Sequence, residues 1–307
     1  MNRVAYFAAT GVSTGRELWR SNGTAVGTWR VRDIVPGLDG SHPEVLTVMG
    51  SALYFRAYDS GSNLWRSDGT EAGTTRVTSG INFPRDLVVQ GQRLFFVADD
   101  PSNGAQIWRT EGTPASTIRL TSIAGLNPAF LTRLGNNTLL FSGISGGLGR
   151  EPHRLINLQL TGIVEIAGDI APGSASSEPV GFMVHEGVGY FSANNGSHGR
   201  ELWRTDGTPA GTWLLADLVP GGGGGAPECL AWLNDRLYFR SGTTGMIYRS
   251  DGTTPGTRTV ATSSRWGCGF TALGARILYW ADQSHNVQTG LQPWVLFADA
   301  IYADAFQ

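Results

Sequence analysis

The segment Glu201-Leu-Trp-Arg-Thr-Asp-Gly-Thr-Pro-Ala-Gly-Thr212 decides the fold, because related segments recur along the whole chain. Residues with a ring fill the position of Trp203 at intervals of 43 to 50 residues. A period of roughly 20 to 50 residues is the signature of a repeat fold. The chain therefore holds seven copies of one unit, whose ring-bearing anchor residues are Trp19, Trp65, Trp108, His153, Trp203, Tyr248 and Trp294.

Each copy is predicted to contain four short strands, which we name a, b, c and d. An apolar strand b, such as Leu53-Tyr-Phe55, precedes the anchor strand c by about ten residues, and strand d, such as Thr212-Trp-Leu-Leu215, follows it. Strand a precedes b and begins near Pro43, Pro84, Pro128, Pro179, Pro227 and Gly267. The predicted c strands cover residues 17–20, 63–66, 106–109, 151–154, 201–204, 246–249 and 292–295.

The connection between strands c and d has the chemistry of a tight turn. It contains Asn22-Gly23, Asp68-Gly69, Glu111-Gly112, Asp206-Gly207 or Asp251-Gly252. Glycine adopts the positive φ that such a turn demands, and an Asp or Asn side chain can accept hydrogen bonds from amides two residues on. Leu18 and Trp19 point to opposite faces of strand c and are both large and apolar, so we expect each sheet to be covered on both faces.

Four short strands in each repeat of about 45 residues are typical of β-propeller blades. We therefore predict an all-β fold, a single seven-bladed propeller over residues 1–307 with four-stranded antiparallel blades and strand a innermost. Copy one begins at strand b and copy seven is expected to run through strand d to Gln307, which gives 27 strands. Either one blade is three-stranded or another segment completes it.

The repeated motif resembles the ELWxxDGT repeat of bacterial proteins, which is sometimes labelled hyalin-like. The resemblance covers essentially the whole chain, although copy four lacks the D-G-T turn and copy seven continues as Trp294-Val-Leu-Phe. It implies a secreted or surface-exposed protein and no agreed biochemical activity. The N-terminus carries no secretory leader, so we expect either a cytoplasmic protein or a sequence from which a leader is missing.

Composition excludes two classes of partner. Lys and Arg number 23 against 25 Asp and Glu, so no basic excess favours nucleic acid. No apolar stretch of about 18 residues predicts a membrane span. Cys229 and Cys268 are too few for a disulfide scaffold.

Two sets of residues are candidates for binding. The repeated Trp, Arg and Asp residues are interpreted mainly as architecture, with the arginines paired to turn acids or carbonyls. The positions where the copies differ are better candidates, because the fold does not dictate them. If strand a lines the channel, its mouth is expected to be ringed by His42, Glu44, Arg85, Glu228, Trp266 and Cys268, together with Phe83.

The histidines and cysteines lack the spacing of a zinc site, and the acidic loops lack an ordered calcium motif, so no metal, cofactor or catalytic residue is predicted. We favour a non-catalytic binding module or scaffold, lectin-like or protein-binding, that takes a carbohydrate, a small polar ligand or a protein partner. The alternative is an enzyme with one site at the channel mouth, where Cys268, His42 and Glu228 would act together.

Overall fold

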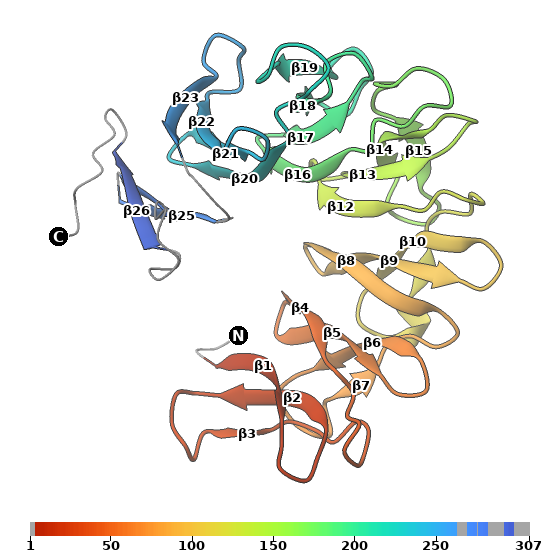
Figure 1. Cartoon of the computed structure of the whole chain (residues 1–307). Helices are drawn as coiled ribbons and strands as arrows, with labels where there is room; N and C mark the ends of the chain where they lie inside the picture. The colour runs from red at the N-terminus through yellow and green to blue at the C-terminus, as the bar shows by residue number, and fades with distance from the viewer. Residues whose placement is uncertain (1–3, 263–268, 275, 282–291, 298–307) are drawn as a thin grey trace. The chain divides into compact units, whose positions relative to one another are not determined.

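The chain is built almost entirely of short antiparallel strands that follow one another as hairpins (Figure 1). The computed structural model describes residues 4–262, 269–274, 276–281 and 292–297. The predicted strand d of copy seven and the candidates Trp266 and Cys268 lie outside these residues. No helix in the described part of the chain is long and apolar enough to cross a membrane.

The strands form seven successive sheets, and in every sheet the spatial order follows the chain. Five sheets have four strands, and the first and last have three within the described ranges. The first sheet is β1 (Ala5–Thr10), β2 (Arg16–Ser21) and β3 (Thr28–Arg30), which are strands b, c and d. The last is β24 (Phe270–Leu273), β25 (Arg276–Ala281) and β26 (Gln292–Phe297), which are strands a, b and c.

Each of the five sheets that lie between the first and the last in the chain contains all four predicted strands. The second sheet is β4 (Glu44–Met49), β5 (Ala52–Tyr58), β6 (Ser62–Ser67) and β7 (Thr75–Arg76). The third is β8 (Asn82–Gln90), β9 (Arg93–Asp100), β10 (Gly104–Thr110) and β11 (Ile118–Arg119), with a short 3₁₀ helix, η1 (Pro114–Ser116), before β11. The fourth is β12 (Ala129–Arg133), β13 (Thr138–Ile144), β14 (Arg150–Ile156) and β15 (Ile163–Ile166). The fifth is β16 (Val180–His185), β17 (Val188–Asn194), β18 (Arg200–Thr205) and β19 (Trp213–Ala216). The sixth is β20 (Pro227–Leu233), β21 (Arg236–Ser241), β22 (Met246–Ser250) and β23 (Arg258–Thr262).

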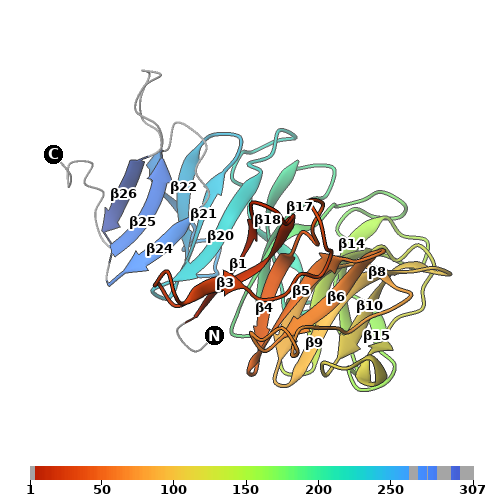
Figure 2. The same ribbon diagram turned by 90° about the horizontal axis from the view of Figure 1, so that it is seen from below.

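By the density of its contacts the chain divides into two compact units. The first contains residues 1–139, 143–145 and 155–164, and the second contains the remainder, so the division passes through the fourth sheet. Figure 2 shows strands of both units from a second side. The organisation of residues 1–307 as one domain stays a prediction.

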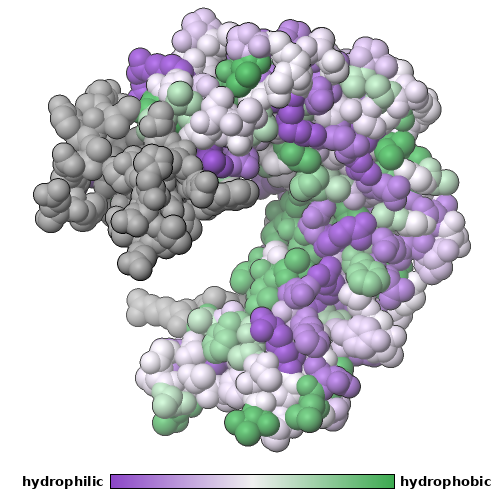
Figure 3. Space-filling view, viewed as in Figure 1, coloured by the Kyte–Doolittle hydropathy of each residue, from purple (hydrophilic) through white to green (hydrophobic). Residues whose placement is uncertain are grey.

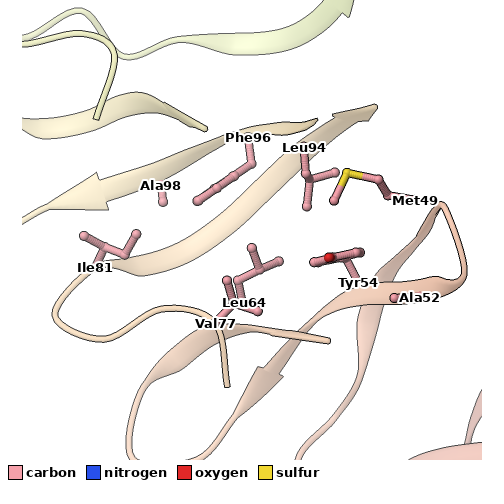
Figure 4. Close-up of a cluster of buried hydrophobic side chains, with 9 residues drawn as sticks. All are labelled: Met49, Ala52, Tyr54, Leu64, Val77, Ile81, Leu94, Phe96 and Ala98. Carbon is pink, nitrogen blue, oxygen red and sulfur yellow. The ribbon is translucent and has the colours of Figure 1, made fainter. Parts of the chain in front are cut away.

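Both faces of the central strands are buried, as the sequence predicts. Leu64 and Leu202 of strand c are fully buried, and their neighbours Trp65 and Trp203 on the opposite face are 6 % and 8 % exposed. Figure 4 shows how neighbouring sheets share this burial: Tyr54 and Leu64 of the second sheet pack with Phe96 of the third. Apolar packing between successive sheets is therefore the main stabilising contact in this part of the chain.

Strand a is bent at the same place in four sheets. A β-bulge places two residues opposite one residue of strand b, between Glu44 and Thr47, Arg85 and Val88, Val180 and Met183, and Glu228 and Ala231. Residues of these bulges adopt positive φ, for example Val45 at +48° and Cys229 at +58°. A bulge bends and twists its strand. In the first unit, large apolar residues are exposed on strand a of the second, third and fourth sheets, including Val45, Phe83 and Phe130, and Figure 3 shows hydrophobic surface there.

Candidate functional site

A pocket of about 410 Å³ lies between the fifth and sixth sheets, within the second compact unit. One wall comes from the end of β19 and the residues after it, and the other from β22, β23 and the turn that joins them (Figure 1). Its volume is in the range of small-molecule sites. The lining residues are Ala216, Asp217, Leu218, Tyr248, Thr254, Thr257, Arg258 and Thr259.

The first reason for the pocket is a small residue where another copy of the repeat has a long one. Asp33-Ile-Val-Pro-Gly37 and Asp217-Leu-Val-Pro-Gly221 align the two copies, so Ala216 corresponds to Arg32. Arg32 fills the space between the first and second sheets: its Nη1 donates to the carbonyl oxygen of Thr74 at 2.6 Å, and its guanidinium lies 5.9 Å from the centre of the Trp65 ring. Alanine leaves that volume empty.

The gap between the fourth and fifth sheets is closed in another way. Here Gly168 takes the position of Ala216, and a Cβ on it would lie only 2.6 Å from the methyl carbon of Thr212. Thr212 also donates from Oγ1 to the carbonyl oxygen of Ala167 at 2.6 Å. The glycine therefore lets the two sheets meet closely at this point.

In the fifth-to-sixth gap a different threonine makes the equivalent contact. Thr254 donates from Oγ1 to the carbonyl oxygen of Leu215 at 2.8 Å, whereas Thr257, the counterpart of Thr212, bonds within its own turn to Ser250 and Thr253. The residue that makes the contact with the preceding sheet therefore lies three positions earlier in this turn than in the turn of the fifth sheet. Thr257 lines the pocket instead of closing it.

The anchor position contributes the aromatic side chain of the pocket. Tyr248 replaces the tryptophan found at the same position in the second and fifth sheets, Trp65 and Trp203. Its ring stacks on Phe239, with 5.3 Å between centroids and 8° between planes, and its side chain is half-buried. Stacking on a fully buried phenylalanine holds the tyrosine in place.

The pocket has a polar lining. The fifth sheet supplies Asp217, and the sixth supplies several threonines. Arg258 borders the pocket, but its register opposite Arg249 places its side chain on the other face of the sheet from Tyr248 and Thr259. Asp217 and Thr259 are exposed, and their side chains make no hydrogen bond or ion pair with the described residues, so they are available to a ligand.

A buried glutamate positions the wall that carries Asp217. Glu201 accepts hydrogen bonds from the backbone N–H groups of Leu218 at 2.8 Å, Val219 at 3.2 Å and Gly225 at 2.6 Å. Burial raises the pKa of this carboxyl, and the negative charge of Asp217 raises it further. The first residue of the E-L-W-R motif therefore fixes the loop that borders the pocket.

The same clamp occurs wherever the motif has glutamate. Glu17 accepts from the amides of Val35 and Ser41, and Glu151 accepts from those of Ile170 and Ser177. Burial raises the pKa of Glu151 as well. The interpretation of the motif as architecture agrees with these contacts.

The polar groups of the D-G-T turns bond to one another. In the fifth sheet Asp206 accepts from the amide and the hydroxyl of Thr208, and Thr208 Oγ1 accepts from the amide of Gly211. Matching bonds occur in the first, second and sixth sheets, for example from Thr70 to Asp68. The hydrogen bond from the threonine side chain is the largest cause of the lowered pKa of Asp68, Asp206 and Asp251.

Three anchor arginines pair with a carbonyl or a turn acid, as the sequence analysis expects. Arg20 and Arg204 donate to carbonyl oxygens of the next sheet's turn, and Arg109 pairs with Glu111. Arg154 instead pairs with Glu165, which belongs to strand β15. His153, which replaces the tryptophan of copy four, is fully buried and stacks on Phe141 at 5.6 Å. Burial lowers its pKa, so it is neutral at pH 7.

The predicted channel-mouth residues that the structure describes lie outside the pocket, and the charged ones form ion pairs within their own sheets. Glu44 pairs with Arg56, Arg85 with Asp99 at 3.1 Å, and Glu228 with Arg240. Glu44 and Glu228 each lie next to a β-bulge, and the register there places them directly opposite their arginine partners on strand b. The sequence did not reveal this pairing.

The remaining candidates are His42, Trp266 and Cys268. His42 is exposed at the start of strand a, and Cys229 is disulfide-bonded. His42 belongs to the first unit and Glu228 to the second, while Trp266 and Cys268 lie outside the described residues. The part of the chain that the structure describes contains no cluster of three or more metal-ligating side chains.

Sequence reasoning missed all eight pocket residues, although a signal was present. The residue before the Asp-x-x-Pro-Gly segment is Arg32, Gly168 or Ala216 in different copies, and the anchor of copy six is tyrosine. Both are positions where the copies differ. Only the packing of neighbouring sheets shows that these differences meet at one place.

No family model matches the sequence, and no curated relative matches it. Solved structures do resemble the chain. A computationally designed protein, Ika8, has a TM-score of 0.55 at 12 % identity, over 95 % of this chain and 82 % of that one. A prolyl endopeptidase has a TM-score of 0.60 at 11 % identity, over 97 % of this chain and 47 % of that one.

A third similar structure is the β-propeller domain of the Trilobed protease from Pyrococcus furiosus. Its TM-score is 0.53 at 11 % identity, over 95 % of this chain and 90 % of that domain. The chain spans about half the length of the prolyl endopeptidase that it matches. Likeness at such low identity concerns the fold alone. Seven successive antiparallel sheets, together with this likeness, identify the fold of the chain as a seven-bladed β-propeller.

Proposed function

We propose that the chain is a non-catalytic binding module that holds one unit of a carbohydrate in the pocket between the fifth and sixth sheets. The observation that carries the proposal is the pocket's origin: it forms where Ala216 and Tyr248 depart from the repeat. Asp217 and Thr259 make no side-chain hydrogen bond or ion pair with the described residues, so the fold does not require them. Residues that the fold does not require are the best candidates for function.

The chemistry of the lining suits a polyhydroxylated ligand. A carboxylate such as that of Asp217 accepts hydrogen bonds from neighbouring hydroxyl groups, and a hydroxyl such as that of Thr259 can donate to ring and hydroxyl oxygens. The ring of Tyr248 offers an apolar face to the C–H groups of a sugar. A cavity of about 410 Å³ is large enough for a monosaccharide.

A binding role fits the pocket better than hydrolysis of a glycoside. Most glycosidases use two carboxyl groups that flank the scissile bond. Asp217 is the only carboxylic acid among the described lining residues, and none of these is a histidine or cysteine. The resemblance to secreted repeat proteins adds an extracellular or cell-surface location to the proposal.

A glycan array, followed by calorimetry with the monosaccharides that score, tests the proposal. We expect the unchanged chain to bind a sugar. Ala216→Arg should weaken binding at least tenfold, because its long side chain would fill the pocket as Arg32 fills the space between the first and second sheets. Asp217→Ala, a change at an exposed loop residue, is expected to weaken binding without affecting folding.

Glu228→Gln serves as the matched control, because Glu228 is a partly exposed residue of the sixth sheet outside the pocket. It should bind as the unchanged chain does. The proposal would be overturned if the unchanged chain bound no sugar. It would also be overturned if Ala216→Arg and Asp217→Ala both bound sugar as tightly as the unchanged chain does.

A further inference from the structure

Two copies of the repeat expose a tryptophan on strand d, at the edge of the sheet. Trp29 of β3 is 43 % exposed and Trp213 of β19 is 38 % exposed, and each compact unit holds one of them. Both lie opposite the anchor arginine of strand c, where the second and third sheets have Thr75 and Ile118. The fold therefore accepts side chains of different size and polarity at this position and does not require tryptophan.

The guanidinium of the anchor arginine lies over each of these two rings. In the first sheet the guanidinium of Arg20 is 4.6 Å from the centre of the Trp29 ring, and in the fifth sheet that of Arg204 is 5.0 Å from the Trp213 ring. Each arginine is itself held by the next sheet, because its Nη1 donates to a glycine carbonyl oxygen in the turn there. The stack therefore keeps an exposed ring in one orientation, and a ring that is already ordered loses less side-chain freedom when a ligand binds.

The same polar groups accompany the ring in both copies. The Nη2 atoms of Arg20 and Arg204 make no hydrogen bond with the described residues, so each keeps its donors for a ligand. The residue before the glycine that the arginine binds is Asp68 in one copy and Asp251 in the other, and both are exposed. An aromatic face, a hydrogen-bond donor and a hydrogen-bond acceptor therefore recur as one set.

We propose that Trp29 and Trp213 are two equivalent platforms for a neutral polysaccharide. The face of an indole packs on the C–H groups of a sugar ring, while the arginine donates to its hydroxyl oxygens and the aspartate accepts from its hydroxyl groups. The guanidinium on the ring disfavours a cationic ligand, and the neighbouring carboxylate disfavours an anionic one.

A polymer suits two equal sites, because it offers the same sugar unit to both and gains avidity when more than one unit is bound. The inference goes beyond the proposed function, since neither tryptophan lines the pocket between the fifth and sixth sheets.

The test is affinity electrophoresis in gels that contain hydroxyethyl cellulose, xylan, dextran or galactomannan. We expect at least one of these polymers to slow the unchanged chain. Trp29→Thr and Trp213→Thr, which introduce the residue of the second sheet, should each weaken the retardation, and the double variant should lower the affinity by about tenfold or more. Phenylalanine at both positions keeps a ring and should retain part of the binding. Ile118→Thr is the matched control at the same position of the third sheet and should migrate as the unchanged chain does.

Acrylamide quenching of tryptophan fluorescence checks the unchanged chain without any substitution, because the bound polymer should protect the two exposed rings. No retardation by any of the polymers, no protection from quenching, or equal retardation of the double variant and the unchanged chain would refute the inference.

Ala216→Arg separates this inference from the proposed function, because it fills the pocket and leaves both platforms intact. If Ala216→Arg abolishes binding of monosaccharides and polymers while the double tryptophan variant binds normally, the inference fails and the proposed function stands. If only the double tryptophan variant loses binding, the inference stands and the pocket is not the binding site.

Discussion

Arg204 of β18 donates a hydrogen bond of 3.0 Å from Nη1 to the carbonyl oxygen of Gly252, which lies in the turn of the following sheet. Arg20 makes the same contact with Gly69, at 3.1 Å. The arginine of one motif therefore binds the glycine of the next. Two residues that recur for separate local reasons also hold neighbouring sheets together.

Replacing Arg204 with methionine should destabilise the fold by about 1.5–3 kcal/mol, the usual value of a hydrogen bond to a charged group. Methionine keeps much of the side-chain volume but cannot donate to Gly252. Urea unfolding followed by tryptophan fluorescence measures the change. Arg236→Met is the control, because Arg236 is exposed and donates only to the adjacent Asp235 carbonyl; equal losses for both variants would contradict the linking role.

Alanine should be tolerated much better at Gly23 than at Gly69, although both have positive φ at the same place in the turn. A Cβ on Gly23 meets nothing within 4 Å, whereas one on Gly69 would overlap the Tyr6 hydroxyl of the preceding sheet. We expect a loss of about 1 kcal/mol at Gly23 from backbone strain, and a further loss of about 1–3 kcal/mol at Gly69 from overpacking.

The double variant Tyr6→Phe with Gly69→Ala isolates the overlap. Removal of the hydroxyl should recover part of the extra loss in a thermal or urea melt. If Gly69→Ala loses no more stability than Gly23→Ala, the inference that the first and second sheets approach closely at Gly69 is wrong.

Glu201→Gln should reduce stability and flatten its dependence on pH. Burial raises the pKa of Glu201 in the folded state, so the stability it contributes is complete below its unfolded pKa, about 4.3, and declines as pH rises through the folded pKa. Glutamine removes that decline. The NH₂ group of glutamine also faces backbone N–H groups whose hydrogen bonds the carboxylate accepted. The loss of an acceptor there should lower the free energy of unfolding by about 1–3 kcal/mol.

Urea unfolding at pH values from about 4 to 7, the range above the unfolded pKa, checks the sign. Asp206→Asn is the control with the opposite expectation, because the pKa of Asp206 is lowered and its contribution is lost only as pH falls below about 4. If the Glu201→Gln variant keeps the pH profile of the unchanged chain in this range, burial does not perturb the Glu201 carboxyl.

Arg258→Trp should stabilise the fold. Tryptophan opposite Arg249 restores the pair seen between Arg204 and Trp213, which is worth about 0.5–1 kcal/mol at an exposed site. Thermal melts measure the change. A loss of stability would mean that a ring at this position does not pack on the arginine of strand c.

Most of the fold follows from the sequence because its signals are local. The D-G-T turn of Asp206 depends on a few neighbouring residues, and the strand around Trp203 shows its two apolar faces directly. The positions of strands a to d are confirmed in the second to sixth sheets. A strand d also forms in copy four, as β15, without the turn motif.

The site could not be predicted in the same way, because it depends on contacts between copies. Glu44 seemed free to bind a ligand, yet a bulged register sets Arg56 opposite it. The pocket exists because Thr254, rather than Thr257, reaches the carbonyl of Leu215, which lies 39 residues earlier in the chain. No local pattern indicates which of two threonines makes that contact.

The sequence by itself determined the number of repeats, the strands and the turns, since these follow from side-chain patterns repeated every 43 to 50 residues. Only the tertiary structure decided which differences between the copies matter. Ala216 and Tyr248 are ordinary substitutions in a list of residues, but packing of the fifth sheet on the sixth brings them together. A cavity belongs to two surfaces at once, so neither segment reveals it alone.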